Sequence, residues 1–123
     1  MNIGKLFAIC ILLLPLCSNA GSVCQVWSFS SAGATGVWSF TGGRDPGSMV
    51  GNGFTTDGSV TQSYSLVATV TPMHKVFVQR RGSTDNNSCD YNGIQIGNEV
   101  TGTFICTSST PTPQAWSALI SEC

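Results

Sequence analysis

Charged side chains are scarce in this chain of 123 residues, and histidine occurs once. Five Lys and Arg residues against six Asp and Glu residues provide no cluster of cations of the kind that nucleic-acid phosphates require. The one basic pair, Arg80-Arg81, is interpreted as a strand end that meets solvent. The cysteines show no Cys-x-x-Cys spacing, and none lies near His74. We therefore expect no nucleic acid as partner, no metal and no cofactor.

Few groups are suited to acid–base catalysis. His74 could act as a general base, but no Gly-x-Ser-x-Gly motif supplies a nucleophile, and we interpret His74 as an exposed strand residue. Asp85, Asp90 and Glu99 fall in predicted turns or strands, where no pattern sets two carboxylates face to face as glycoside hydrolysis requires. We therefore expect that the protein is not an enzyme, and a small hydrolase is the least favoured alternative.

The longest apolar run lies at the N-terminus. Lys5 precedes it, residues 6–16 form it, and Ser18-Asn19-Ala20 supplies small residues for cleavage, which are the three parts of a secretory signal peptide. The run is about 11 residues long, whereas a membrane-spanning helix needs about 20. We expect residues 1–20 to be a signal peptide, and residues 21–123 to form a single exported domain without a stable membrane span. The location would be periplasmic or extracellular, and the short signal favours a bacterial source.

Four cysteines remain after cleavage at this position. An even number in a short exported chain indicates two disulfides, because that compartment is oxidising. The cysteines are Cys24, Cys89, Cys106 and Cys123.

The remaining sequence has the pattern of an all-β domain. Runs rich in β-branched and aromatic residues alternate with turns rich in glycine, and no stretch shows helical periodicity over three turns. The pattern predicts a small antiparallel up-and-down meander of about eight strands that closes into a barrel, with a β-sandwich as the alternative. The expected strands cover 23–29, 35–41, 49–55, 59–71, 73–80, 88–96, 99–107 and 115–121.

One hairpin can be predicted to the level of residue pairs. If Gly97-Asn98 is a two-residue turn, Ile96 lies opposite Glu99, and the same register places Cys89 opposite Cys106. That rung is a non-hydrogen-bonded pair with a Cα separation of about 4.5 Å, which a disulfide can bridge. We therefore expect the disulfide Cys89–Cys106.

The same register brings Tyr91 opposite Phe104 and Gly93 opposite Gly102. An aromatic pair beside two glycines predicts a ribbon that coils strongly, and so a curved sheet.

The remaining pair, Cys24 with Cys123, would join the start of the first strand to the end of the last. These ends are adjacent when an even number of up-and-down strands closes into a barrel, or when an even-stranded sandwich brings its termini together.

The segment Gly36-Val37-Trp38 resembles the Gly-x-Trp motif on an early strand of calycin-type barrels. That group includes lipocalins, avidins and a bacterial family of secreted metalloprotease inhibitors. The resemblance implies a small secreted barrel that extends across most of the mature chain, and a Trp38 that points inward with Phe40 on the same face. Ligand residues of those families are not transferred, since the motif covers three residues.

Candidate binding residues are aromatic or lie in a glycine-rich loop. Tryptophans can stack on sugars or line an apolar pocket while the indole N–H donates, although in strands of a small β domain they more often form the core. The candidate tryptophans are Trp27, Trp38 and Trp116. Arg44, in the segment 42–47, could bind a polar ligand or instead close a surface turn with Asp45.

The function expected from these features is that of an exported noncatalytic binding or inhibitory β-barrel module. Its partner would be a small molecule or a protein. The alternative is a structural or surface-associated protein. The sequence leaves the oligomeric state open.

Overall fold

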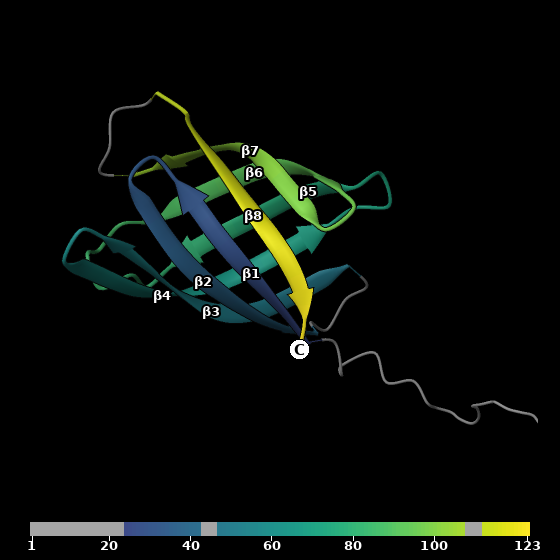
Figure 1. Cartoon of the computed structure of the whole chain (residues 1–123), viewed down its shortest axis with the longest axis horizontal. Helices are drawn as coiled ribbons and strands as arrows, with labels where there is room; N and C mark the ends of the chain where they lie inside the picture. Colours follow the sequence, from purple (N-terminus) through teal and green to yellow (C-terminus); the bar gives the residue numbers. More distant parts are fainter. Residues whose placement is uncertain (1–23, 43–46, 108–111) are drawn as a thin grey trace, which may run out of the picture.

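Antiparallel strands close into a barrel in the computed structural model, which describes residues 24–42, 47–107 and 112–123. Each strand pairs with the next, and the last lies beside the first (Figure 1). This order confirms the all-β meander and selects the barrel over the sandwich. The strands are β1 (Cys24–Ser31), β2 (Ala34–Gly42), β3 (Ser48–Asp57), β4 (Val60–Val70), β5 (Lys75–Arg81), β6 (Cys89–Ile96), β7 (Glu99–Cys106) and β8 (Gln114–Glu122).

The expected signal peptide at residues 1–20 and the candidate Arg44 lie outside the described residues. Within the described ranges, no helix has the length and apolar character needed to cross a membrane.

Alternate residues of each strand point into the barrel, as the two-residue period of β-structure requires. In β3 the buried positions include Met49 and Thr55, and in β4 they include Tyr64, Leu66 and Ala68. The buried apolar side chains form one continuous cluster, to which Met49, Tyr64, Leu66 and Ala68 belong together with Trp27, Phe29, Trp38, Phe40, Val76, Val78, Tyr91, Val100, Trp116, Ala118 and Ile120.

The predicted register of the β6–β7 hairpin is confirmed. Ile96 pairs with Glu99, and Cys89 pairs with Cys106 across a Cα separation of 4.0 Å and is joined to it by a disulfide. Each further expected pair is also present: Tyr91 with Phe104, and Gly93 with Gly102.

The second disulfide, Cys24–Cys123, is also confirmed. It lies where β1 and β8 close the barrel, and the Cys123 amide donates a hydrogen bond of 3.2 Å to the Cys24 carbonyl. The chain ends described by the structure are therefore held together, as Figure 1 shows.

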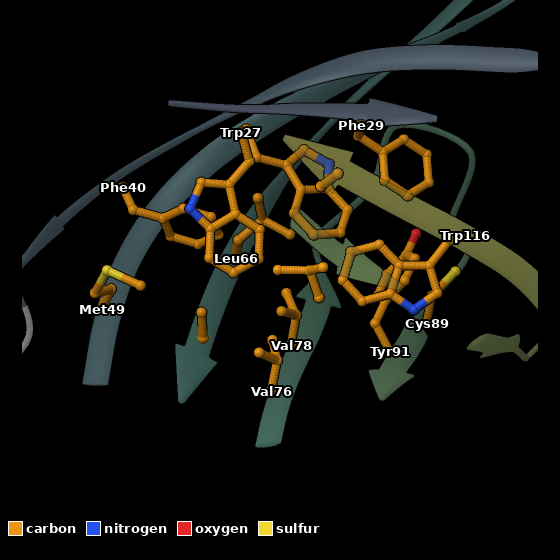
Figure 2. Packing of buried hydrophobic residues seen from close by; sticks show 14 of the residues in the cluster. Trp27, Phe29, Phe40, Met49, Leu66, Val76, Val78, Cys89, Tyr91 and Trp116 are labelled. Carbon is orange, nitrogen blue, oxygen red and sulfur yellow. The ribbon is translucent and has the colours of Figure 1, made fainter. Parts of the chain in front are cut away.

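The barrel has two ends with different chemistry. At one, here called the mouth, lie the turns β1–β2 and β3–β4 and the loop 82–88 after β5. The opposite end carries the Cys24–Cys123 disulfide and the turns β4–β5 and β6–β7. Figure 2 shows the core between them, with Phe40 and Met49 gathered to one side and Phe29, Tyr91 and Trp116 to the other.

Candidate binding site at the mouth of the barrel

The lumen of the barrel is occupied by the three tryptophans. Trp27 and Trp38 are fully buried and Trp116 is 3% exposed, and ring centroids lie 6.1 Å apart for Trp27–Trp38 and 5.6 Å apart for Trp38–Trp116. Eight-stranded barrels either fill their interior with side chains or hold one small ligand there. A ligand inside this barrel would have to displace the tryptophans.

The indole N–H groups of these tryptophans are engaged by protein atoms. Trp38 donates to the Tyr64 hydroxyl at 2.9 Å, and Trp116 donates to the Asn92 carbonyl at 3.0 Å. The Trp27 indole donates to the side chain of Gln25, also at 3.0 Å. The structure thus brings the three candidate tryptophans together as core residues, and none of them lines either of two recesses that described residues form at the barrel surface.

A recess of about 210 Å³, here called the mouth cleft, opens at the mouth of the barrel. The ends of β1 to β8 and the loop 82–88 contribute its walls. Its lining combines aromatic rings, amides and charged groups, among them Phe29, Gln62, Arg80, Tyr91, Phe104 and Gln114.

Arg80 lies in the lining of this cleft and is 7% exposed. Its side chain follows Val76 and Val78 on the inner face of β5, so the same alternation that buries the valines also buries this arginine. The interpretation of Arg80 as a solvent-facing strand end is therefore wrong. The neighbouring Arg81 does face solvent: it points outward and pairs with Asp90 at 3.0 Å.

Three neighbours compensate for the loss of water around the Arg80 guanidinium. The guanidinium carbon lies 4.1 Å from the centroid of the Tyr64 ring, a cation–π arrangement. One terminal nitrogen, Nη2, donates to the Ser83 hydroxyl at 3.0 Å and to the Asp85 carboxylate at 3.3 Å. The Nε–H is buried without an acceptor among the described residues, so this side chain retains an unused donor there.

Two tyrosines lie beside Arg80: Tyr91 lines the cleft, and the Tyr64 ring, which is buried, packs against the guanidinium. The Tyr64 hydroxyl, which accepts from Trp38, is also hydrogen-bonded to the Thr55 hydroxyl. Burial raises the pKa of Tyr91 to about 12, although hydrogen bonding and charge from Arg80 partly oppose the increase. Tyr91 is therefore protonated and uncharged at neutral pH, so it adds no negative charge beside Arg80, which is the cationic residue among the described lining residues.

The loop 82–88 is anchored to β4 as well as to Arg80. The Thr84 amide donates to the Ser63 carbonyl at 3.1 Å, and the Ser63 amide donates to the Thr84 hydroxyl at 3.2 Å. Partial burial would raise the pKa of Asp85, but hydrogen bonds from Ser83 and the Asn87 amide and the charge of Arg80 outweigh it and lower the pKa. Asp85 is therefore ionised at neutral pH and holds the loop over Arg80.

A second recess, here called the outer groove, has a volume of about 380 Å³ and lies on the outer wall of β6 and β7. The ion pair Arg81–Asp90 borders it, together with the hydroxyls of Ser88 and Thr103. Phe104 and Cys106 line both the outer groove and the mouth cleft. The two recesses therefore adjoin at Phe104.

His74 lies away from both recesses, in the turn between β4 and β5. It is exposed and has a backbone φ of 65°, so the interpretation as a strand residue is wrong although that of exposure is confirmed. Pro72 and the left-handed φ place the residue in the turn, and β5 begins at Lys75. No group of His, Cys, Asp or Glu side chains suited to a metal ion occurs in the part of the chain that the structure describes.

Comparison with known proteins adds no relative, since no family model, curated protein or solved structure matches the chain.

Proposed function

We propose that the protein is an exported, noncatalytic binding module of the calycin type that takes its ligand at the mouth cleft and not in the lumen. The observation that carries this proposal is the contrast between a lumen filled by Trp27, Trp38 and Trp116 and an open cleft above a buried Arg80. Perturbed and buried charged groups in a recess are typical of functional sites.

Two further features support the proposal. Disulfides persist in oxidising compartments, and this barrel carries two of them, Cys24–Cys123 and Cys89–Cys106. Trp38 of the Gly-x-Trp segment is buried on the inner face of β2, next to Phe40, as the resemblance to calycin barrels implies.

The experiment maps where small molecules bind on the isotopically labelled mature protein. We expect a library of neutral and charged fragments to shift backbone NMR signals of residues around the mouth, with little change at the opposite end. Ala34→Phe, which places a ring in the mouth cleft, should abolish the shifts, whereas Thr69→Phe, at an exposed position on β4 towards the opposite end of the barrel, should keep them. Shifts confined to another surface, or unchanged binding to Ala34→Phe, would disprove the proposal.

A surface-associated role is the second candidate. It is favoured by half-exposed apolar side chains on neighbouring strands of the outer wall, where Val50 pairs with Val67 and where Phe77 and Ile94 follow on β5 and β6. Apolar patches on an outer surface often mark contacts between proteins. Self-association in sedimentation experiments that Val67→Lys abolishes would favour this role, and a monomer at all concentrations would exclude assembly of the protein with itself.

A further inference from the structure

We propose that the mouth cleft binds the terminal residue of a neutral glycan, whose chain leaves across Phe104 into the outer groove. The inference rests on the proposed function, since it names the ligand class of the mouth cleft. It is carried by the charges, the hydrogen-bonding groups and the placement of the two recesses.

The charges around the mouth cleft disfavour strongly ionic ligands. Its lining contains one cation, Arg80, which is paired with Asp85, and a second carboxylate, Asp57, so the formal charges of the described lining sum to −1 and disfavour an anionic ligand. An anionic ligand would meet both carboxylates, and a cationic ligand would meet the guanidinium. In the outer groove the charges of Arg81 and Asp90 neutralise each other. A ligand without net charge avoids these conflicts.

The hydrogen-bonding groups of the lining suit a ligand with many hydroxyls. The Asp57 carboxylate only accepts, whereas the side-chain amides of Gln62 and Gln114 both donate and accept. The outer groove adds the hydroxyls of Ser88 and Thr103. A sugar hydroxyl is donor and acceptor at once, so it can satisfy every one of these groups. A carboxylate ligand could not, because it accepts only.

Phe104 provides an apolar surface between the two recesses. Its ring is half-buried and stacks on Tyr91, with centroids 4.9 Å apart and an interplanar angle of 23°, so its orientation is fixed. Aromatic rings pack well against the C–H groups of sugars while hydroxyls at the rim bind polar side chains. This combination places a sugar ring at the junction of the mouth cleft and the outer groove.

The size of each recess argues for an extended ligand. The mouth cleft of about 210 Å³ is smaller than the roughly 300 to 1,000 Å³ typical of pockets that enclose a drug-sized molecule, so it accommodates one end of a ligand. The adjoining outer groove of about 380 Å³ has room for the sugar residues attached to that end. Peptides commonly bind by extending an open strand edge, and the described strands close on themselves, which favours the glycan over a peptide.

The test uses labelled mature protein and defined probes at millimolar concentration. The neutral probes are maltotriose, cellotriose and N,N′,N″-triacetylchitotriose, and the comparison probes are hexanoate, hexylamine and the blocked peptide acetyl-Ala-Gly-Ala-amide. We expect at least one trisaccharide to shift the signals of Gln62, Phe104 and Thr103 together, because these residues line the two recesses.

Two half-buried glutamines provide a matched pair of variants. Gln62→Ala removes an amide from the mouth cleft and should raise the Kd about three- to tenfold, the effect of one lost hydrogen bond. Gln95→Ala, at the opposite end of the barrel, should leave the Kd unchanged.

The outcomes separate the ligand class from the location of the site. Binding of the peptide, hexanoate or hexylamine at the mouth while no trisaccharide binds would overturn the glycan proposal and leave the mouth as the binding site. Binding of trisaccharides at another surface, with the same Kd for Gln62→Ala and Gln95→Ala, would overturn both the glycan proposal and the mouth as the binding site. A trisaccharide that shifts Gln62 but neither Phe104 nor Thr103 would overturn the path across Phe104.

Discussion

The guanidinium of Arg80 lies inside the barrel because its neighbours replace the water that it loses. Burial of an unpaired charge costs several kcal/mol, and the Tyr64 ring, the Ser83 hydroxyl and the Asp85 carboxylate each offset part of that cost. Ser83 and Asp85 belong to the loop after β5, so the arginine helps to hold the loop in place, together with the hydrogen bonds between Thr84 and Ser63. The residue that shapes the mouth cleft therefore also orders one of its walls.

At the residue scale, Asp85→Asn tests this coupling through pH. The pKa of Asp85 is lowered in the folded protein, so its ionised form stabilises the fold at neutral pH, and this contribution is lost as the pH falls through the folded-state pKa. We expect Asp85→Asn to lower the free energy of unfolding by about 1 kcal/mol at neutral pH, because the carboxylate is partly exposed and water screens the pair. The difference from the parent should shrink in acid, as measured by urea unfolding at a series of pH values.

Asp90→Asn is the control for that measurement. Asp90 pairs with Arg81 on the outer wall, where both side chains are about half exposed or more, so its removal should change the stability little at any pH. Equal effects of Asp85→Asn and Asp90→Asn would show that the buried Arg80 gains no more from the Asp85 carboxylate than the exposed Arg81 gains from Asp90.

The sequence contained the information needed to place Arg80, in the alternation of Val76, Val78 and Arg80 along one face of β5. The prediction that both arginines face solvent was wrong because it was based on the charge of Arg80-Arg81 and not on that alternation. The contacts that make burial acceptable come from Tyr64 and from the loop 82–88. Strand pattern predicts neither the conformation of that loop nor its position over the mouth.

At the scale of elements, β3 is shaped by what its neighbours require. A Cβ atom on Gly53 would lie 2.6 Å from Cδ1 of Trp38 and 2.7 Å from Cε1 of Tyr64, closer than side chains tolerate. The glycine thus leaves room for two large rings on β2 and β4. Glycine lowers the strand propensity of this segment, but β3 still forms ten residues of strand.

Gly53→Ala should therefore destabilise the barrel. Alanine in place of glycine usually stabilises by about 0.4 to 1 kcal/mol through the unfolded chain, whereas overpacking a core costs about 1 to 3 kcal/mol. Since the new methyl group meets two fixed rings, we expect the overpacking to dominate and the midpoint of urea unfolding to fall. Asn52→Ala, the outward-facing neighbour, should change the midpoint little. A variant Gly53→Ala as stable as the parent would mean that Trp38 and Tyr64 can move apart.

The β6–β7 hairpin was predictable in full because its register depends on local signals. A two-residue turn at Gly97-Asn98 fixes every pair, and the two cysteines fall on a rung that a disulfide can bridge. The mouth cleft was not predictable in this way. Its residues come from every strand and are brought together only when the barrel closes, and its only described cation is partly compensated through the pairing of Arg80 with Asp85.

At the scale of the whole molecule, closure depends on the seam between β1 and β8. These strands are farthest apart in the chain, so their pairing closes the largest loop and costs the most conformational entropy. The Cys24–Cys123 disulfide restricts that loop in the unfolded chain, with a separation of 99 residues, whereas Cys89–Cys106 restricts a loop of 17. In the entropic model the two bonds are worth about 4.7 and about 3 kcal/mol.

Replacing the two cysteines of each disulfide with alanine should show which bond stabilises the protein more. We expect Cys24→Ala/Cys123→Ala to lower the free energy of unfolding by more than Cys89→Ala/Cys106→Ala, and to lower hydrogen-exchange protection first at Val26 and Ser121, which pair with each other across the seam. Cys89 and Cys106 are buried, so replacing them with alanine also removes packing contacts. This loss lowers the free energy of unfolding further and reduces the expected difference between the two double variants. A larger loss for the hairpin pair, with protection at the seam unchanged, would show that packing of the aromatic core keeps the barrel closed and that the terminal disulfide contributes little. The predicted order, together with fraying at Val26 and Ser121, would assign closure to the covalent link between the chain ends.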